Sequence, residues 1–198
     1  MKFVIPKIIH QIWIGNPMPV SMQPLLETWK KHHPSWEYRL WGNEEVAKFD
    51  FPEKHLFHKA PRLNMKADIL RLAILREFGG LYVDTDMECL RTFSSLINTG
   101  RQGFVAIEPN GIICNAMIGA IPNAEFLGAC LANIYLEKSH YDFKETLNKT
   151  GPGLIDRVIR NNYLNQVRIH PASLFYYHSI SEQQKNKHIH YIISLELG

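Results

Sequence analysis

The chain has 198 residues, of which 45% are hydrophobic, and its formal net charge is +3 at pH 7. This length suits one folded domain with a sizeable core, here residues 1–198. So small a charge excess argues against a nucleic-acid partner and is compatible with an anionic ligand or with peripheral association at a membrane surface. The three cysteines, Cys89, Cys114 and Cys130, lack a Cys-x-x-Cys spacing, which indicates neither a zinc site nor a disulfide framework and favours a reducing interior.

The N-terminal stretch is too short and is interrupted too soon, by Pro6, to form a signal peptide. No apolar run is long enough for a transmembrane segment. We therefore expect a soluble, cytoplasmic protein.

Strands and helices are predicted to alternate along the chain. Hydrophobic periodicity indicates strands over residues 7–14, 36–41, 81–83, 103–107, 167–170 and 189–195, and helices over residues 21–33, 43–49, 62–78, 124–138 and 154–161. Residues 50–61 are predicted to form a loop, in which His55 and His58 are expected to be solvated. This alternation is typical of an α/β sandwich.

The most informative stretch is residues 67–86. A helical pattern stops at Gly79 and Gly80, a short apolar strand follows, and Asp84 and Asp86 come where this strand ends. In open α/β sheets, ligands bind at the carboxyl ends of the strands. Two such carboxylates suit Mg²⁺ or Mn²⁺, which prefer oxygen ligands and are often completed by waters and substrate phosphates. The alternative is a polar turn with no ligand.

Four other residues place polar or flat aromatic side chains in apolar surroundings. Asp68 and Arg71 interrupt the apolar helix, which implies either a partner inside the fold or a bound ligand such as a phosphate. Asn115 stands alone in an apolar run, so it either satisfies core backbone groups or faces a site. Trp13 lies near the end of the first strand, where it either packs in the core or stacks on a nucleobase.

Five stretches, in this order, resemble one known family. They are IPKIIHQIW at residues 5–13, WEYRLW at 36–41, ADILR at 67–71, GGLYVDTD at 79–86 and TGPG at 150–153. Together they resemble family 32 of the glycosyltransferases, the family with a sugar-binding region containing the DXD motif. This family includes capsular polysaccharide glycosyltransferases, α-1,6-mannosyltransferases and, more distantly, large glucosylating toxins. The likeness covers roughly residues 4–160.

The resemblance implies a GT-A fold, which is an α/β fold with a Rossmann-like mixed sheet flanked by helices. It implies a hexosyltransferase that moves a sugar with retention of configuration and depends on Mn²⁺ or Mg²⁺. The expected donor is a UDP-sugar, with GDP-mannose as the second choice. The expected acceptor is a glycan or a lipid-linked molecule, in the synthesis of a surface polysaccharide such as a capsule at the inner face of the membrane.

The resemblance also assigns roles to individual residues. Asp86 would bind the metal directly, and Asp84 would contact the ribose or a metal-bound water. Trp13 would stack on the base of the donor. Asp68 and Arg71 would hold the hydroxyls of the donor sugar and the phosphate side. By the same resemblance, Asn115 would line the sugar pocket. An acceptor-side loop would be formed by Thr150, Gly151 and Pro152.

The end of the chain departs from the family pattern. Members commonly finish with a histidine followed shortly by a tryptophan, in a segment that closes over the diphosphate and adds a metal contact. His190 stands in the place of that histidine, but no tryptophan follows it. We therefore predict a divergent or shortened C-terminal lid, with His190 as an additional metal ligand.

Two other functional classes fit parts of the pattern. Haloacid dehalogenase-like phosphatases also place Asp-x-Asp after an apolar strand, and Asp84 would then be the nucleophile. Their motif usually lies near the start of the fold and has Thr or Val where this chain has Glu88. The other alternative is a non-catalytic module that binds a sugar nucleotide or a glycan, which the altered C-terminus favours.

Overall fold

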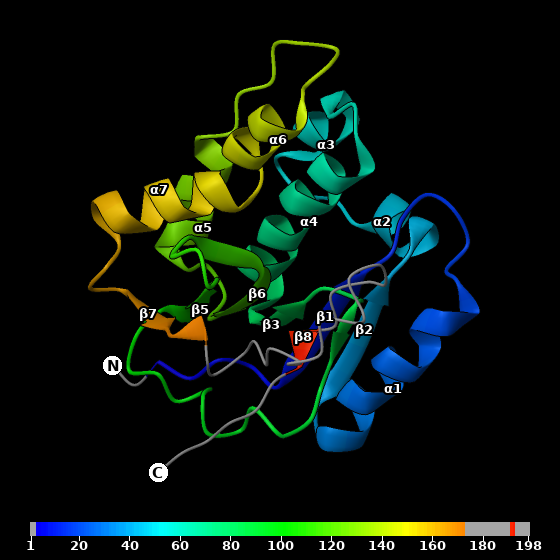
Figure 1. Cartoon of the computed structure of the whole chain (residues 1–198), viewed down its shortest axis with the longest axis vertical. Helices are drawn as coiled ribbons and strands as arrows, with labels where there is room; N and C mark the ends of the chain where they lie inside the picture. Colours follow the sequence, from blue (N-terminus) through cyan, green and yellow to red (C-terminus); the bar gives the residue numbers. More distant parts are fainter. Residues whose placement is uncertain (1–2, 173–190, 193–198) are drawn as a thin grey trace.

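The computed structural model describes residues 3–172 and 191–192, and its centre is a six-stranded mixed sheet (Figure 1). In spatial order the strands are β2 (Glu37–Trp41), β1 (Ile8–Ile12), β3 (Gly80–Val83), β6 (Ile113–Ala120), β5 (Gly103–Ile107) and β7 (Val167–His170). Only β6 runs antiparallel to its neighbours within this sheet. The parallel strands β1 and β3 therefore end at the same edge, and Asp84 follows β3 there.

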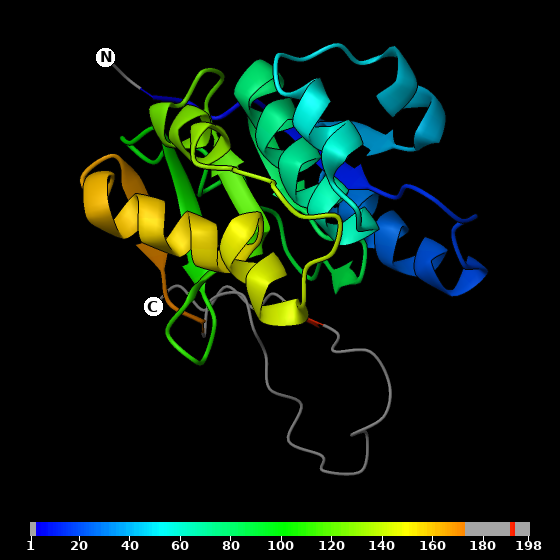
Figure 2. The same ribbon diagram turned by 90° about the horizontal axis from the view of Figure 1, so that it is seen from above.

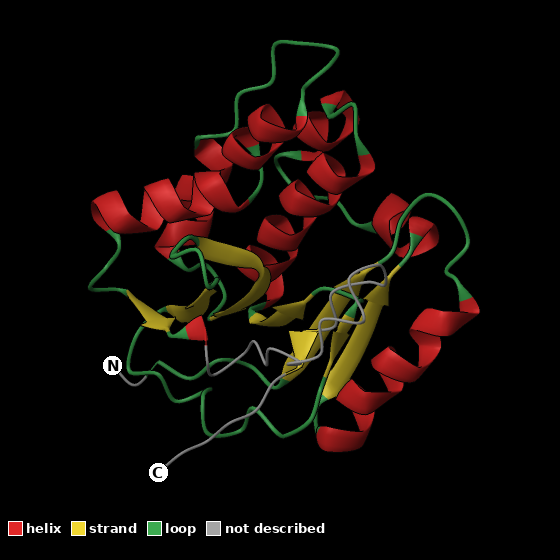
Figure 3. Ribbon diagram, viewed as in Figure 1, coloured by secondary structure: helices red, strands yellow, loops and turns green. Residues whose placement is uncertain are grey.

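Helices cover both faces of this sheet (Figure 3). They are η1 (Val20–Met22), α1 (Gln23–His32), α2 (Asn43–Lys48), α3 (Lys54–Lys59), α4 (Leu63–Phe78), α5 (Glu125–Ala132), α6 (Phe143–Lys149) and α7 (Pro152–Asn162). One core cluster joins α4, α5 and α7 to the sheet, and α7 packs against β6 (Figure 2). The other cluster packs Trp29 of α1 against the segment that follows β3. The expected mixed sheet flanked by helices is confirmed.

The turn from α4 into β3 has the predicted form. The helix ends at Gly79, and both Gly79 and Gly80 have positive φ, at 62° and 98°. The buried His10 side chain closes this turn, because its Nε2 lies 2.9 Å from the Gly79 carbonyl oxygen and its Nδ1 lies 3.1 Å from Trp41 Nε1. An indole N–H can only donate, so Nδ1 accepts and Nε2 carries the proton. We call His10, Trp41, Gly79 and Gly80 the histidine cluster.

The structure differs from the predicted elements at three places. Residues 50–61 contain the short helix α3, because Leu56 and Phe57 pack against the core. The helix predicted over residues 124–138 ends at Ala132, and the Tyr141 hydroxyl accepts hydrogen bonds from two backbone N–H groups in the chain that follows. Helix α6 was not predicted, although Asp142 and Glu145 form a capping box at its start.

The end of the described chain returns to the turn that carries Asp84 and Asp86, which we call the acidic turn. Strand β8 (Tyr191–Ile192) pairs in parallel with β4 (Met87–Glu88), which directly follows Asp86. His190 lies outside the described residues, so its predicted metal contact stays a prediction. Among the helices that the structure describes, none is both long and apolar enough to cross a membrane.

Candidate active site

Backbone contacts from two neighbouring strands fix the end of β3. The Asp84 N–H donates to the carbonyl of Ala116, at 2.9 Å, in β6. The Asp84 carbonyl accepts from Gln11 Nε2 at 3.1 Å, and the Tyr38 hydroxyl donates to Gln11 Oε1 at 2.6 Å. Because Gln11 is fully buried, this chain of contacts from β2 through β1 holds the turn that carries Asp84 and Asp86.

The side chain of Asp84 is held through one of its two oxygens. The Tyr82 hydroxyl donates to Asp84 Oδ1 at 2.6 Å, and Arg71 Nη1 lies 3.3 Å from the same oxygen. The Arg71 guanidinium also lies over the Tyr82 ring, 4.5 Å from its centroid. Asp84 Oδ2 makes no such contact with the described residues, and the side chain is 32% exposed. This oxygen can therefore reach a ligand.

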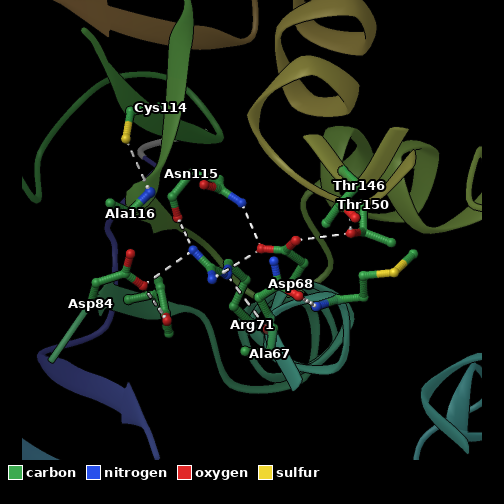
Figure 4. A network of polar contacts seen from close by, with 12 residues as sticks. Ala67, Asp68, Arg71, Asp84, Cys114, Asn115, Ala116, Thr146 and Thr150 are labelled. Carbon is green, nitrogen blue, oxygen red and sulfur yellow. Dashed lines mark hydrogen bonds and ion pairs between the residues drawn. The ribbon is translucent and has the colours of Figure 1, made fainter. Parts of the chain in front are cut away.

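Arg71 is the centre of a buried polar network (Figure 4). Its Nη1 donates to the Asn115 carbonyl at 2.5 Å, and its Nη2 lies 3.0 Å from Asp68 Oδ1. Asn115 Nδ2 donates to Asp68 Oδ1 at 2.8 Å, and the Thr150 hydroxyl donates to Asp68 Oδ2 at 2.8 Å. We call these four residues, together with Asp84, the arginine network: Asp68, Arg71, Asp84, Asn115 and Thr150.

Burial and charge act against each other in this network. Burial raises the pKa of Asp68, and the Arg71 charge and the Thr150 hydrogen bond act in the opposite direction. Burial alone would lower the pKa of Arg71, but Tyr82, Asp84 and Asp68 raise it overall, so the guanidinium stays charged. Burial raises the pKa of Tyr82 well above its usual value, which keeps its hydroxyl a neutral donor to Asp84.

A cavity of about 320 Å³ lies beside this network. Its lining residues are Ile12, Trp13, Ile14, Asn16, Leu63, Asn64, Ala67, Arg71, Tyr82, Asp84 and Thr85. Trp13 is half-buried, and its indole N–H is already bonded to the Asn16 carbonyl, at 2.8 Å. A second cavity, of about 410 Å³, adjoins the first and shares Ile14 and Leu63 with it. The two cavities offer room for an elongated ligand.

The structure brings most of the predicted site residues together. Trp13, Arg71 and Asp84 line one cavity, and Asp86 lies on the same turn as Asp84. Asp68 and Asn115 are only 6% and 8% exposed, and they contact Arg71 from behind. The predicted acceptor-side loop also lies close to Asp68. Thr150 bonds to it, Gly151 is the N-cap of α7, and Pro152 is the first residue of that helix.

Sequence reasoning missed Gln11, Tyr38 and Tyr82. The position of Tyr82 could have revealed it, because residues two apart on a strand share a face and Asp84 follows two residues later. Gln11 gave a weaker signal as a lone amide in an apolar strand. Tyr38 gave none, because an alternating aromatic strand reads as core.

The acidic turn fits a hard divalent cation that has few protein ligands. Within the part of the chain that the structure describes, no group of three or more His, Cys, Asp or Glu side chains could hold a metal ion. Asp84 and Asp86 would supply two oxygen ligands, and Mg²⁺ and Mn²⁺ commonly complete such sites with water and substrate phosphates. Asp68 and Asp84 both pair with the Arg71 guanidinium, so this guanidinium faces two carboxylates.

Comparison with known proteins identifies the family. The family model "Glycosyltransferase sugar-binding region containing DXD motif" matches residues 19–102, which include Asp84-Thr85-Asp86. An uncharacterized glycosyltransferase of Acanthamoeba polyphaga mimivirus is 28% identical over 87% of this chain and 75% of its own length. Inositol phosphoceramide mannosyltransferase 3 of Schizosaccharomyces pombe is 32% identical over 75% of this chain, which spans only 43% of that relative.

Two solved structures share the fold. The PaToxG glycosyltransferase superposes with a TM-score of 0.65 at 18% identity, over 83% of this chain and 71% of its own. The UDP-bound glycosyltransferase domain of the YGT toxin gives a TM-score of 0.61 at 13% identity, over 85% and 80%. Both are GT-A domains, which confirms the expected GT-A fold. The chain belongs to the glycosyltransferase family whose sugar-binding region contains the DXD motif.

Proposed function

We propose that this chain transfers a hexose from a nucleoside diphosphate sugar, with retention of configuration, in a reaction that depends on Mn²⁺ or Mg²⁺. The observation that carries the proposal is that Trp13, Arg71 and Asp84 line one cavity beside the acidic turn. This arrangement supports the proposal, because a flat aromatic, a fixed positive charge and a carboxylate suit a base, a diphosphate and its counter-ion. Membership of the family argues against a haloacid dehalogenase-like phosphatase.

The roles of the residues follow from their positions. The face of the Trp13 indole would pack on the base, since the indole N–H is already bonded. Arg71, held by Asp68 and Asn115, would place its positive charge near the departing diphosphate without reorganisation. Asp86 and Asp84 would hold the divalent cation, which when bound neutralises the developing charge of the leaving group.

A UDP-sugar is the first choice for the donor, and GDP-mannose is the second. A structural neighbour was solved with UDP bound, which supports the first. Several relatives are named as mannosyltransferases, which supports the second. For the acceptor we propose a glycan or a lipid-linked molecule at the inner, cytoplasmic face of a membrane, in surface polysaccharide synthesis such as that of a capsule. The name inositol phosphoceramide mannosyltransferase supports a lipid-linked acceptor.

The test is donor binding and hydrolysis with and without Mn²⁺, on a panel of uridine and guanosine sugar nucleotides. We expect one donor to bind and hydrolyse only with metal, and Asp86→Ala to reduce turnover by a factor on the order of 100 or more. Asp50→Ala is the matched control, because the Asp50 side chain is 94% exposed and lies outside both cavities. If Asp86→Ala turned over like the wild type, the metal assignment would be wrong.

The same panel separates an enzyme from a binding module. Saturable, metal-dependent binding of a donor without hydrolysis or transfer, even with glycan and lipid-linked acceptors supplied, would indicate a non-catalytic sugar-nucleotide module. If no donor bound under any metal condition, the proposed function would be refuted and only the family and the fold would stand.

A further inference from the structure

Asp68 is bonded through both of its carboxylate oxygens, and the second oxygen is held from a distant part of the chain. Oδ1 faces Arg71 and Asn115. Oδ2 accepts from the hydroxyl of Thr150, which is 82 residues away in the sequence and fully buried. Figure 4 shows this contact joining α4 to the segment between α6 and α7. The carboxylate therefore cannot rotate without breaking a contact on one side or the other.

The Thr150 hydroxyl has two acceptors within reach and one hydrogen to give. Asp68 Oδ2 lies at 2.8 Å, and the Thr146 carbonyl lies at 3.4 Å. The shorter distance and the negative charge both favour the carboxylate, since hydrogen bonds to ionised acceptors are stronger. The Thr146 carbonyl does not depend on this hydroxyl, because it also accepts from the backbone N–H groups of Thr150 and Gly151, at 3.2 and 3.3 Å.

The backbone next to Thr150 is packed closely as well. A Cβ on Gly151 would lie 3.1 Å from Leu147 Cα and 3.6 Å from Asp68 Oδ2. The junction of α6 and α7 thus lies directly against the carboxylate, with little space for a larger residue at position 151.

We propose that Thr150 is a positioning residue, whose hydroxyl fixes the Asp68 carboxylate and thereby aligns the Arg71 guanidinium at the wall of the donor cavity. The inference rests on the proposed function, because it assigns the cavity beside Arg71 to the donor. It differs from the acceptor-side role that the family resemblance implies for residues 150–152. Here the loop acts on the donor side, through a second residue, and without contacting the ligand.

The physical reason is that a buried carboxylate oxygen needs a partner. Without the hydroxyl, Asp68 would either take up a proton or turn toward another donor. Both changes alter its contact with Arg71 Nη2 and leave the guanidinium less well fixed. Arg71 also contacts the Asn115 carbonyl, Asp84 and, through its Nε, the Ala67 carbonyl at 3.5 Å, so a shift of the guanidinium would also reach the acidic turn.

The experiment compares Thr150→Val, which removes the hydroxyl at nearly constant volume, with Thr150→Ser, which keeps it. Thr146→Val is the matched control. Thr146 is also a buried threonine, it precedes Thr150 by one helical turn, and its hydroxyl donates to the Asp142 carbonyl at 2.8 Å and not to Asp68. Metal-dependent donor hydrolysis is measured on each folded protein as kcat and KM, together with the thermal midpoint.

We expect Thr150→Val to lower kcat/KM roughly ten- to a hundredfold, as removal of an orienting partner commonly does. In Thr150→Ser, which keeps the hydroxyl, kcat/KM should stay within about threefold of the wild-type value. Thr146→Val should lower the thermal midpoint and leave kcat/KM of the folded protein unchanged. Wild-type kcat/KM in Thr150→Val, or an equal loss in Thr146→Val, would overturn the proposal.

A second readout does not depend on activity. The side-chain Nε–H signal of Arg71, assigned by NMR with an Arg71→Lys variant, reports how the guanidinium is held. In Thr150→Val this signal should shift, and its proton should exchange faster with solvent. In Thr150→Ser the signal and its exchange rate should match those of the wild type. If the wild type hydrolysed no donor, the proposed function would fail. An unchanged Arg71 signal in Thr150→Val would refute the positioning role separately.

Discussion

Buried polar side chains hold β3 at both of its ends, and the two sets differ in charge. At the start of the strand, the histidine cluster bonds His10 Nε2 to the Gly79 carbonyl at 2.9 Å. At the other end, the arginine network bonds Arg71 Nη1 to the Asn115 carbonyl at 2.5 Å. In both places a side-chain nitrogen satisfies a backbone carbonyl in the interior, but His10 is neutral and Arg71 is a cation surrounded by carboxylates.

The histidine cluster is a closed structural unit. His10 is fully buried, both of its ring nitrogens have partners, and burial lowers its pKa to about 4. The cluster contributes no residue to the lining of either cavity. Its contacts hold the turn between α4 and β3, which sets where β3 begins and so where Asp84 arrives.

The arginine network opens onto a cavity through Arg71 and Asp84. A buried ion pair is weak grounds for stability, because the cost of removing two charges from water can exceed their attraction. Ionisable groups that are buried against charge partners at a cavity wall are candidates for a functional site. The comparison therefore assigns stability to the neutral cluster and ligand binding to the charged one, and this division can be tested.

The largest expected effect is on activity, from Arg71→Lys. A lysine keeps the charge but cannot bond to the Asn115 carbonyl, Asp68 and Asp84 together. We expect metal-dependent donor hydrolysis to fall about 10²- to 10³-fold, the loss typical of removing a fixed charge-stabilising donor. Steady-state kinetics on the folded variant measure this.

Arg76→Lys is the matched control for that variant. Arg76 lies on the same helix and makes two contacts with Glu53, at 2.7 and 2.6 Å, but it lines neither cavity. We expect its hydrolysis rate to stay within about twofold of the wild type, with a small loss of stability. Equal losses of activity in Arg71→Lys and Arg76→Lys would mean that the arginine network has no special relation to the ligand.

The second expected effect is on stability, from Gly80→Ala in the histidine cluster. A Cβ at this position would lie 2.6 Å from the Ile8 carbonyl oxygen and 3.1 Å from His10 Nε2, on a backbone with φ of 98°. We expect a loss of about 3 kcal/mol or more in the free energy of unfolding. Gly111→Ala has a similar φ of 85° but nothing within 4 Å, so it should lose only about 1–2 kcal/mol. Urea denaturation of both variants gives the difference, and equal losses would show that the close packing around the cluster adds nothing.

Local sequence patterns predicted the acidic turn well. Two glycines after an apolar helix, a short strand and two carboxylates one residue apart were enough to place Asp84 and Asp86 at the edge of the sheet. The order of the motifs along the chain also predicted the family. The acidic turn rests on residues that are neighbours in sequence, where spacing determines geometry, and the family rests on five short stretches in a fixed order.

Contacts between distant segments could not be predicted in the same way. The apolar helix indicated that Asp68 and Arg71 need a partner, but not that Thr150 would be one of them. The hydrogen bond from Tyr38 to Gln11 depends on the pairing of β1 with β2, which the sequence pattern did not specify. Helix α3 was missed because its six residues carry no side-chain cap, and its position is set by packing against the core.

The third expected effect is the pH dependence of stability caused by His10. Its pKa is about 4 in the folded protein and 6.5 as an ordinary histidine, so between these values the unfolded chain binds more protons. Stability should therefore be complete above about pH 6.5 and should fall on acidification toward pH 4, by about 3 kcal/mol in total from this group.

His10→Gln isolates this contribution, because glutamine can donate to the Gly79 carbonyl but does not titrate. Burial also lowers the pKa of His33 and His170, and both act in the same direction, so the wild-type slope alone does not identify His10. Urea unfolding of both proteins at intervals between pH 4.5 and pH 7.5 gives two curves. The wild-type curve should be steeper by up to about 1.4 kcal/mol per pH unit, the value for one proton. Parallel curves would mean that His10 has similar pKa values in the folded and unfolded chain. The histidine cluster would then not be closed and neutral, and the contrast with the arginine network would fail.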